Sequence, residues 1–565
     1  MVAGTKRGLL LFGFHTFAVH LLAAVFMSFF VEYYVHERLL IVNVRPVKAK
    51  DRHDEVQAHL STWGLLLFVI AQTAYAVVTS LHRFGLLSLV TTAFPSSRVL
   101  PVLLRRLSCE QCFALLFGLS WWLLRFPLLP SAVSFTCLFA ALSALAEGCS
   151  AFTAQAAREM AQQRPKEGEW IAWVARLAAA SVAAVVFAAA LLYDGAVPRS
   201  GRLGGFHWLV LMMSVGALGV FSGLQHVRRR AHAAESSSPS SVREDAEHPW
   251  SPPSSLTSAD ASSAEFHAFA RQTCQRRSMK ALLAVRALHC YAHSFVLYFA
   301  HLVLTLGCGL QLSAAIRAAI LGVVIAASSL LSPMGAVVCA VLGKKRGLSM
   351  GFAVVAMLGA ASLLLAYLTR DTDTAEAAGP RVIEPKPKNF LVEVSTAGTA
   401  WCAIMVALQR LVLDALRDML DLAQEDVVEE DAILFGRASS MTTCTKQLTS
   451  VGNVPMQSLS FAMVLLFLAA SRAFRVVPAF AHVATSTPPL TNSSRVVTPA
   501  PPTLMPSYVV ANGSTMLALL GLQTCGVAVA MCVVWQRFYN LDGKHLQFVQ
   551  MATRKRSDEQ ATTLV

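Results

Sequence analysis

The side chains of this sequence that could do chemistry are a few charged and titratable groups placed inside long apolar runs. Arg410 and Asp414 stand four residues apart in LQRLVLDALRD, so on a helix they share one face and can pair. Charges inside a membrane are costly unless they are paired or hydrated, which makes both residues candidates for solute binding or gating. The alternative is a static pair that holds two helices together.

His289 and His293 repeat this spacing in another apolar run. Histidine titrates near neutral pH, so the two side chains suit proton exchange or contact with a solute, whereas packing between helices is the simpler alternative. Two His at this spacing also match zinc-ligand geometry, but the sequence offers no third ligand with suitable spacing. We therefore predict no metal site and no cofactor.

Glu147 is a lone carboxylate in the apolar run LSALAEGCSAF. Burial disfavours the charged form of a carboxyl group, so Glu147 could take up and release a proton, and it is the best sequence candidate for a proton-coupling group. Pairing with Arg125 or Arg176 is the alternative.

The elements that must carry these residues follow from composition. Of the 565 residues, 55% are hydrophobic and 14% are charged, whereas about 25% are charged in an ordinary soluble domain. Hydrophobic runs of roughly 20 residues match a bilayer core about 30 Å thick, so we predict an all-α integral membrane protein with twelve transmembrane helices. The predicted spans are 8–31, 60–81, 110–129, 131–153, 170–192, 206–226, 281–306, 316–342, 349–368, 397–420, 443–470 and 514–536.

The orientation follows from the basic residues. Lys and Arg are concentrated in segments on the same side as the N-terminus, among them 228–230, 344–346 and 554–556. The positive-inside rule then places both termini in the cytosol. The sequons at Asn492 and Asn512 fall in the loop 473–512 on the opposite side, so we predict a glycoprotein. The sequence leaves open whether the membrane is the plasma membrane or an endomembrane.

Two classes of protein are not expected. The net charge of +14 reflects the basic residues beside the spans, and no aromatic and basic surface for nucleic acid is visible. The spans hold no paired aspartates, no HExxH and no GxSxG, so we do not expect an enzyme. The expected partners are the lipid bilayer and a small-molecule solute, with protons as an open possibility, and we expect a monomer.

A segment rich in Ser, Pro and acidic residues, ESSSPSSVREDAEHPWSPPSS, divides the spans into six and six. It has too little apolar surface to fold. We predict an N-terminal six-helix bundle over 1–226, a disordered cytosolic linker over 227–280, a C-terminal six-helix bundle over 281–536 and a cytosolic tail over 537–565. This layout is typical of two-bundle secondary transporters, whose solute site lies between the halves near the membrane midplane.

Residues 409–458 contain an ordered set of polar motifs. Gln409-Arg410 and Asp414 are followed by an acidic run over 426–431, by Arg437, and by Pro455-Met456-Gln457-Ser458. In this order the motifs resemble the transmembrane-protein-180-like branch of the major facilitator superfamily, a relative of the glycoside and cation symporters. The resemblance implies the major facilitator fold and a symporter-like secondary transporter that moves a small solute by alternating access.

The chain also departs from that pattern. The second span has no carboxylate, and the segment after it reads Ser-Leu-His82-Arg83-Phe-Gly85, where the superfamily has Gly-x-x-x-Asp-Arg-x-Gly-Arg-Arg. These departures favour the alternative, a receptor or scaffold with this fold that does not transport. The two are distinguished by whether Arg410 and Asp414 face a hydrated space or a closed helix contact.

The acidic residues after the tenth span are expected to form a cytosolic loop. We predict that this loop holds one access state through ion pairs with basic residues. The acids are Asp426, Glu429, Glu430 and Asp431, and the expected partners are Arg83, Lys344, Lys345, Arg346 and Arg437.

Overall fold

The computed structural model describes most of the chain as helices and one small sheet. The described residues are 6–35, 39–44, 56–83, 108–125, 130–163, 168–194, 204–236, 266, 268–308, 314–377, 389–435, 442–470, 474–478, 507–511, 513–541, 546–549 and 551–552. Asn492, Asn512 and Arg437 lie outside them. Arg83 ends a helix, but its side chain is not among the described ones.

Twelve long helices lie within the described residues, and each predicted span overlaps one of them, although residues 126–129 of the third span lie outside the described part. The first six are α1 (Lys6–Tyr34), α2 (Thr62–Arg83), α5 (Cys109–Arg125), α6 (Ser131–Gln163), α7 (Gly168–Asp194) and α8 (Gly204–Ser236). The second six are α10 (Arg277–Cys308), α11 (Ala314–Leu342), α12 (Lys344–Ala377), α13 (Asn389–Leu434), α14 (Thr442–Ala470) and α15 (Gly513–Phe538). The prediction of an all-helical membrane fold is confirmed in its main feature.

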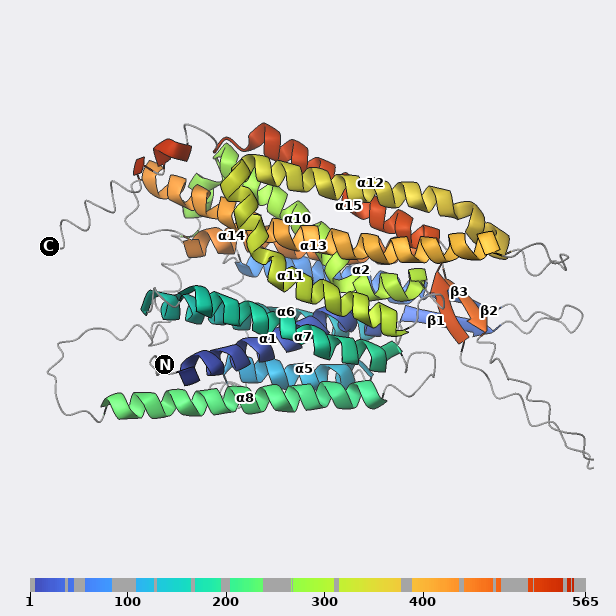
Figure 1. Cartoon of the computed structure of the whole chain (residues 1–565), viewed down its shortest axis with the longest axis horizontal. Coiled ribbons are helices and arrows are strands. Elements are labelled where there is room, and N and C mark those ends of the chain that lie inside the picture. Colours follow the sequence, from blue (N-terminus) through green and yellow to red (C-terminus); the bar gives the residue numbers. More distant parts are fainter. Residues whose placement is uncertain are drawn as a thin grey trace, which may run out of the picture.

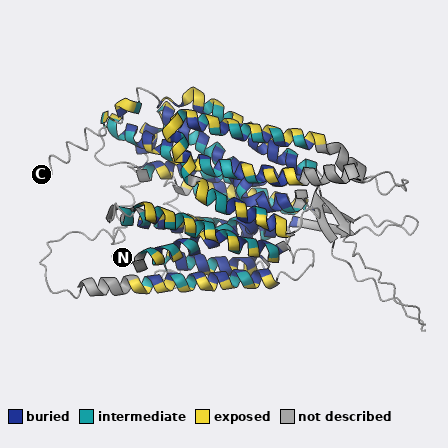
Figure 2. Cartoon of the chain, viewed as in Figure 1, coloured by how far each residue is buried: buried dark blue, intermediate teal, exposed yellow. Residues whose placement is uncertain are grey.

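The helices are of the kind that crosses a membrane. Nine described helices are long and apolar enough to span a bilayer, or ten when the two parts of α11, bent by 47° between Leu331 and Pro333, are one span. Large apolar side chains such as Val341, which is 76% exposed, and Tyr367, which is 73% exposed, face outward. Buried residues concentrate between the helices (Figure 2). The chain is therefore an integral multi-pass membrane protein.

The helices run alternately up and down, with α1 beginning and α15 ending at the same end of the molecule (Figure 1). We call this the terminal end, and the opposite end, where the strands lie, the sheet end. Helices from the first six pack on one another, and so do helices from the second six. Across the two sets, α1 packs on α10, α2 on α14 and α7 on α11. These three pairs form the interface between the halves.

The predicted linker overlaps helices at both of its ends. Helix α8 continues to Ser236, and α10 begins at Arg277. Residues 237–265 lie outside the described part of the chain, so the expected disorder of the linker stays a prediction.

Two glycines let helices of the second half approach closely. A Cβ added to Gly359 of α12 would lie 2.7 Å from the backbone nitrogen of Cys525, and one added to Gly521 of α15 would lie 2.7 Å from the carbonyl oxygen of Gly359. Small residues at such crossings allow backbones to pack together, which drives helix association in a lipid environment.

A four-stranded antiparallel sheet lies at the sheet end, and the sequence analysis did not predict it. Its strands are β1 (Leu40–Val44), β2 (Val56–Leu60), β3 (Phe474–Pro478) and β4 (Ser507–Ala511), in the order β1-β2-β3-β4. Leu40 is opposite Leu60, Gln57 is opposite Arg475, and Phe474 is opposite Ala511. Strands β1 and β2 follow α1, whereas β3 and β4 follow α14, so the sheet joins the two halves.

Candidate functional site

A short polar contact between the halves joins α1 to α10 near the sheet end. Nδ1 of His301 lies 2.5 Å from Oε2 of Glu32, and neither side chain has any exposed surface. The His301 ring makes edge-to-face contacts with Phe29 and Tyr193, and the distances between ring centroids are 4.9 Å and 5.6 Å. We call Glu32 and His301 the sheet-end pair. The pair is a carboxylate and an imidazole enclosed by aromatic rings.

Aromatic packing also closes the interface between the halves. Phe139 of α6 and Phe461 of α14 lie 5.2 Å apart between ring centroids, and Tyr298 of α10 lies 5.4 Å from Phe139 and 6.4 Å from Phe26 of α1. All four residues are buried. These four rings and the sheet-end pair are therefore shielded from solvent.

Four predicted site residues meet at the middle of the second half. His289 and His293 of α10 stack with ring centroids 5.4 Å apart, and Nε2 of His293 lies 2.6 Å from Oδ1 of Asp414 in α13. His289 donates from Nε2 to the backbone carbonyl of Leu413 at 2.9 Å. We call His289, His293, Arg410 and Asp414 the central polar cluster. Helical spacing brought each pair to one face, and the packing of α10 on α13 brings the pairs together.

The partner of Asp414 differs from the expected one. Nε of Arg410 is 3.9 Å from Oδ2 of Asp414, so this ion pair is longer than a hydrogen bond, and His293 is the close partner. Arg410 is buried, whereas 23% of the Asp414 side chain and 11% of the His293 side chain are exposed. The carboxylate therefore faces solvent on one side and the buried guanidinium on the other.

Glu147 belongs to another part of the interface. It is exposed on α6, and it lies within electrostatic range of Tyr298 of α10. Gln457 of α14, a residue of the Pro455-Met456-Gln457-Ser458 motif, is adjacent to the same tyrosine. Pro455 lies inside α14 two residues earlier. Glu147 thus lies beside residues of the other half, while Arg176, one of its two expected partners, lies over the Trp173 ring.

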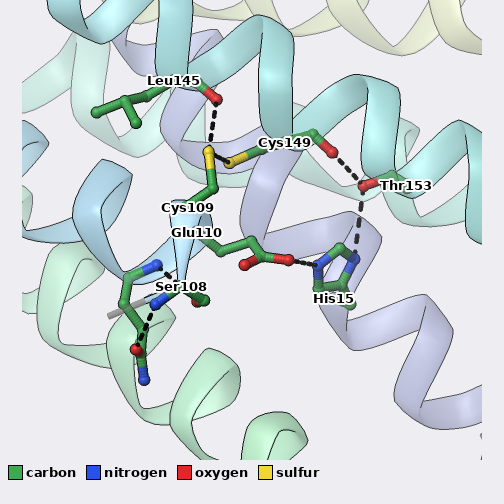
Figure 3. Close-up of polar contacts among 8 residues, drawn as sticks. His15, Ser108, Cys109, Glu110, Leu145, Cys149 and Thr153 are labelled. Atoms are coloured by element: carbon green, nitrogen blue, oxygen red, sulfur yellow. Dashed lines mark hydrogen bonds and ion pairs between the residues drawn. The ribbon is translucent and has the colours of Figure 1, made fainter. Parts of the chain in front are cut away.

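A further acid and histidine meet in the first half. Nε2 of His15 in α1 is 3.4 Å from Oε1 of Glu110 in α5, and Nδ1 of the same ring is 3.5 Å from the hydroxyl of Thr153 in α6 (Figure 3). The sulfur of Cys109 lies 3.9 Å from that of Cys149 beside this contact (Figure 3). His15 thereby ties three helices of the first half to one another.

Solvent reaches the interface on the terminal side of the central polar cluster. His20 of α1 is exposed, and it lies within electrostatic range of Arg417 of α13, which is also exposed. Helix α1 is the central helix of its half, since it packs on α5, α6, α7, α8 and α10. An exposed residue in the middle of such a helix, facing a charge of the other half, indicates that the halves are less tightly packed here than near the sheet end.

The acidic run at the end of α13 is helical and largely buried, so its prediction as an exposed loop is wrong. Nζ of Lys344 is 2.6 Å from Oδ1 of Asp426, as expected, and it also donates to the carbonyl of Leu422 at 2.9 Å. Glu430 and Asp431 pair with Arg276, which was not among the expected partners.

The remaining predicted gating residues are less enclosed. Glu429 and Lys345 are half-buried, and Arg346 is exposed. Burial raises the pKa of both Asp426 and Glu429, although Lys344 opposes that rise. The ion pairs found for this run join α13 to α12 and to the segment before α10, so they lie within the second half.

Sequence reasoning missed Glu32 and its partner. The sequence features that could have indicated this pair were the single acid in FVEYYV, near the end of the first span, and the third histidine of the seventh span. Within the described residues, no group of three or more His, Cys, Asp or Glu is placed to hold a metal ion.

No protein-family model matches the chain, and no curated protein matches it. The resemblance to the transmembrane-protein-180-like branch therefore stays a prediction. Among solved structures, the chain is similar to a bacterial homologue of the human drug peptide transporters PepT1 and PepT2, with 11% identity, 97% of this chain and 98% of that chain covered, and a TM-score of 0.43. It is also similar to a POT family transporter in complex with 5-aminolevulinic acid, with 10% identity, 95% and 98% coverage, and a TM-score of 0.44.

Proposed function

We propose that this protein is a secondary transporter that moves a small solute by alternating access with proton coupling. The up-and-down helices, the three helix pairs between the halves and the polar cluster at mid-depth support this proposal. Rocking of two helical bundles about a site near the midplane is how such folds expose a solute to one side of the membrane at a time.

The observation that supports this proposal most directly is the sheet-end pair. Opening the interface at the sheet end would separate α1 from α10, and with them Glu32 from His301. Two ionisable groups without exposed surface would then become hydrated, and each could exchange a proton with the solution. Closing again requires a protonation state in which the pair can form its hydrogen bond. The opening of one side would thus be linked to proton binding.

Other titratable groups lie around this pair. Tyr193 of α7 contacts the His301 ring, and Tyr33 of α1 lies 3.3 Å from Nε2 of His207 in α8. Tyr298 lies one turn away on α10. Glu32, His301 and His207 are the acid and imidazole side chains among these groups, so they are the ones whose charge could change during the cycle.

The solute would bind at the central polar cluster, on the solvent-accessible side of the sheet-end pair. Glu147 remains a second candidate for proton coupling, because it lies at the interface beside Tyr298. The positive-inside argument supports a terminal end that faces the cytosol, with the sheet on the opposite side.

The test uses purified full-length protein in liposomes with a pH-sensitive dye inside. A panel of sugars, amino acids, organic acids and nucleosides is screened for solutes that are taken up and that move protons. Wild type is compared with Glu32→Gln and Glu147→Gln, and with Glu169→Gln as a control, because Glu169 is exposed in the first turn of α7.

We expect at least one solute whose uptake moves protons in wild type and in the control but not in Glu32→Gln. Loss of coupling in Glu147→Gln alone would move the coupling site to α6. Failure of every solute to be taken up by a well-folded protein would contradict transport and favour a receptor or scaffold.

A further inference from the structure

Arg410 has hydrogen-bonding capacity that its surroundings do not use. Only 8% of its side chain is exposed, and its one charged neighbour within the described residues is Asp414, at 3.9 Å. Its Nε and Nη1 atoms form no hydrogen bond with any described residue. A buried guanidinium normally has acceptors for its N–H groups, so each unmatched donor in a folded protein requires an explanation.

The neighbouring polar groups do not supply those acceptors. Asp414 is hydrogen-bonded to His293 at 2.6 Å, and His289 donates to the backbone of Leu413. Gln409, the preceding residue of α13, donates to the hydroxyl of Ser362 at 3.2 Å, and its side-chain carbonyl oxygen forms no hydrogen bond with any described residue, so it does not accept from Arg410. Arg410 is the member of the central polar cluster whose donors remain unmatched.

The guanidinium lies next to a place that solvent reaches. Asp414, within 4 Å of Arg410, exposes 23% of its side chain, and its partner His293 exposes 11%. A small molecule that arrives at these two residues would therefore lie close to unmatched N–H donors. The planar guanidinium group can donate two parallel hydrogen bonds to the two oxygens of one carboxylate or phosphate group. A hydroxyl or an amide carries no negative charge, so it would bind the guanidinium more weakly.

We infer that Arg410 binds an anionic oxygen group of the solute, a carboxylate or a phosphate, beside the His293–Asp414 contact. The hydrogen bond from His293 offsets part of the negative potential of Asp414, so an anion that approaches Arg410 does not meet an unpaired carboxylate. The inference deepens the proposed function, on which it rests for transport, but binding can be tested separately. It assigns the protein to acids or zwitterions rather than to neutral sugars.

The test measures binding by thermal shift on the full-length protein in detergent. The probes are matched pairs: amino acids with their amides, short dicarboxylates with their diamides, and glycerol 3-phosphate with glycerol. Lysophosphatidate is added as a separate probe, so that a lipid headgroup is distinguished from a free phosphate ester. The variants are Arg410→Lys and Arg410→Gln, and Arg537→Gln serves as a control because Arg537 is exposed on α15.

We expect stabilisation by at least one acid but not by its neutral partner. The apparent affinity should fall at least about tenfold in Arg410→Gln and less in Arg410→Lys, and it should not change in the control. Arg410→Lys keeps a buried positive charge, so it provides an answer if Arg410→Gln does not fold.

Three results would overturn the inference: no acid stabilises wild type, an amide or alcohol binds as well as its acid, or Arg410→Gln binds the acid unchanged. Acid binding without uptake in liposomes would instead contradict the transport proposal and leave the subsite standing. Uptake of neutral solutes without any preference for acids would support transport and contradict the anion subsite at Arg410.

Discussion

Helix α10 carries the same chemical contact twice, in two different settings. His293 contacts Asp414 at 2.6 Å, and His301, eight residues or about 12 Å further along, contacts Glu32 at 2.5 Å. The first contact lies within the second half and is reached by solvent, whereas the second joins the halves and is fully buried. A contact between a histidine and a carboxylate can therefore be part of a binding site at one position and a contact that must open at another.

The surroundings explain why the two contacts differ. Around His301, the rings of Phe29 and Tyr193 exclude water, so the pair gains stability only while the halves stay together. Around His293, one side of Asp414 remains accessible, so a solute can reach the carboxylate without separation of the helices.

The largest expected effect comes from fixing the interface between the halves. In a variant whose native cysteines are replaced, Phe139→Cys and Phe461→Cys place thiols on α6 and α14, where the native ring centroids are 5.2 Å apart. A short bifunctional thiol reagent should abolish uptake into liposomes, because the halves can no longer separate on that side.

The matched control joins two helices of one half. Phe352→Cys and Trp535→Cys replace rings whose centroids are 6.4 Å apart on α12 and α15. Cross-linking this pair should leave most of the uptake intact. Equal loss with both pairs would show that rigidity in general, and not closure of the interface, stops the protein.

The second expected effect concerns stability. Glu32→Ala leaves His301 buried without its acid, which should lower the free energy of unfolding by about 3–5 kcal/mol. Asp414→Ala should cost about 1–2 kcal/mol, because solvent can replace part of the lost contact. Denaturant titration in detergent micelles measures both values.

The double variant Glu32→Leu with His301→Phe separates charge from packing. Since both polar groups are replaced by apolar ones, it should recover most of the stability lost in Glu32→Ala while it abolishes proton coupling. A double variant as unstable as the single one would indicate that the volume of the pair, rather than its charge, holds the halves together.

The sequence predicted the helices well, because apolar runs of the right length admit few other structures in a membrane. It misplaced the end of α13. The acidic run there reads as a solvated loop, but Leu420, Ala423 and Val427 continue one buried face for two further turns. Lys344 then pairs with an acid on this extended part of the helix. The short strands were missed because five-residue β-branched segments such as SYVVA carry little signal inside long loops.

The candidate site was predictable in part. Spacing of four residues placed His289 with His293 and Arg410 with Asp414, but a single sequence does not reveal that α10 packs against α13. The sheet-end pair was beyond reach for the same reason. Glu32 and His301 are 269 residues apart, and each taken alone is one polar residue near the end of an apolar run.

The third effect separates the two contacts by function. Asp414→Asn should weaken solute affinity by roughly tenfold, because Asp414 holds His293 and Arg410 in their positions, while protons still move with the solute, since the sheet-end pair is intact. Glu32→Gln should leave solute affinity close to that of wild type while uptake no longer moves protons. Thermal-shift titration gives the affinity, and dye fluorescence in liposomes gives the coupling. The same phenotype for both variants would mean that the two contacts act as one site.

The smallest expected effect concerns the buried acids at the end of α13, which lie outside the membrane. They belong neither to the proposed binding site nor to the interface between the halves, so they serve as a reference for both contacts. Burial raises the pKa of Glu429, and the neighbouring Asp426 raises it further. Between the ordinary pKa of glutamate and this raised value, the folded chain holds more protons than the unfolded chain. Stability therefore falls as the pH rises through that window.

Glu429→Gln removes the titration, so it should raise the unfolding temperature at pH 7.5 by an amount that corresponds to less than about 1 kcal/mol. At pH 4.5 it should change the unfolding temperature less, because this pH lies below the raised pKa of Glu429. Glu169→Gln, at an exposed position, should show no such dependence on pH. Uptake should be unaffected, because Glu429 touches neither the sheet-end pair nor the central polar cluster. A loss of uptake in Glu429→Gln would instead show that the terminal end of α13 moves during the cycle, as the predicted gating role of the acidic run requires.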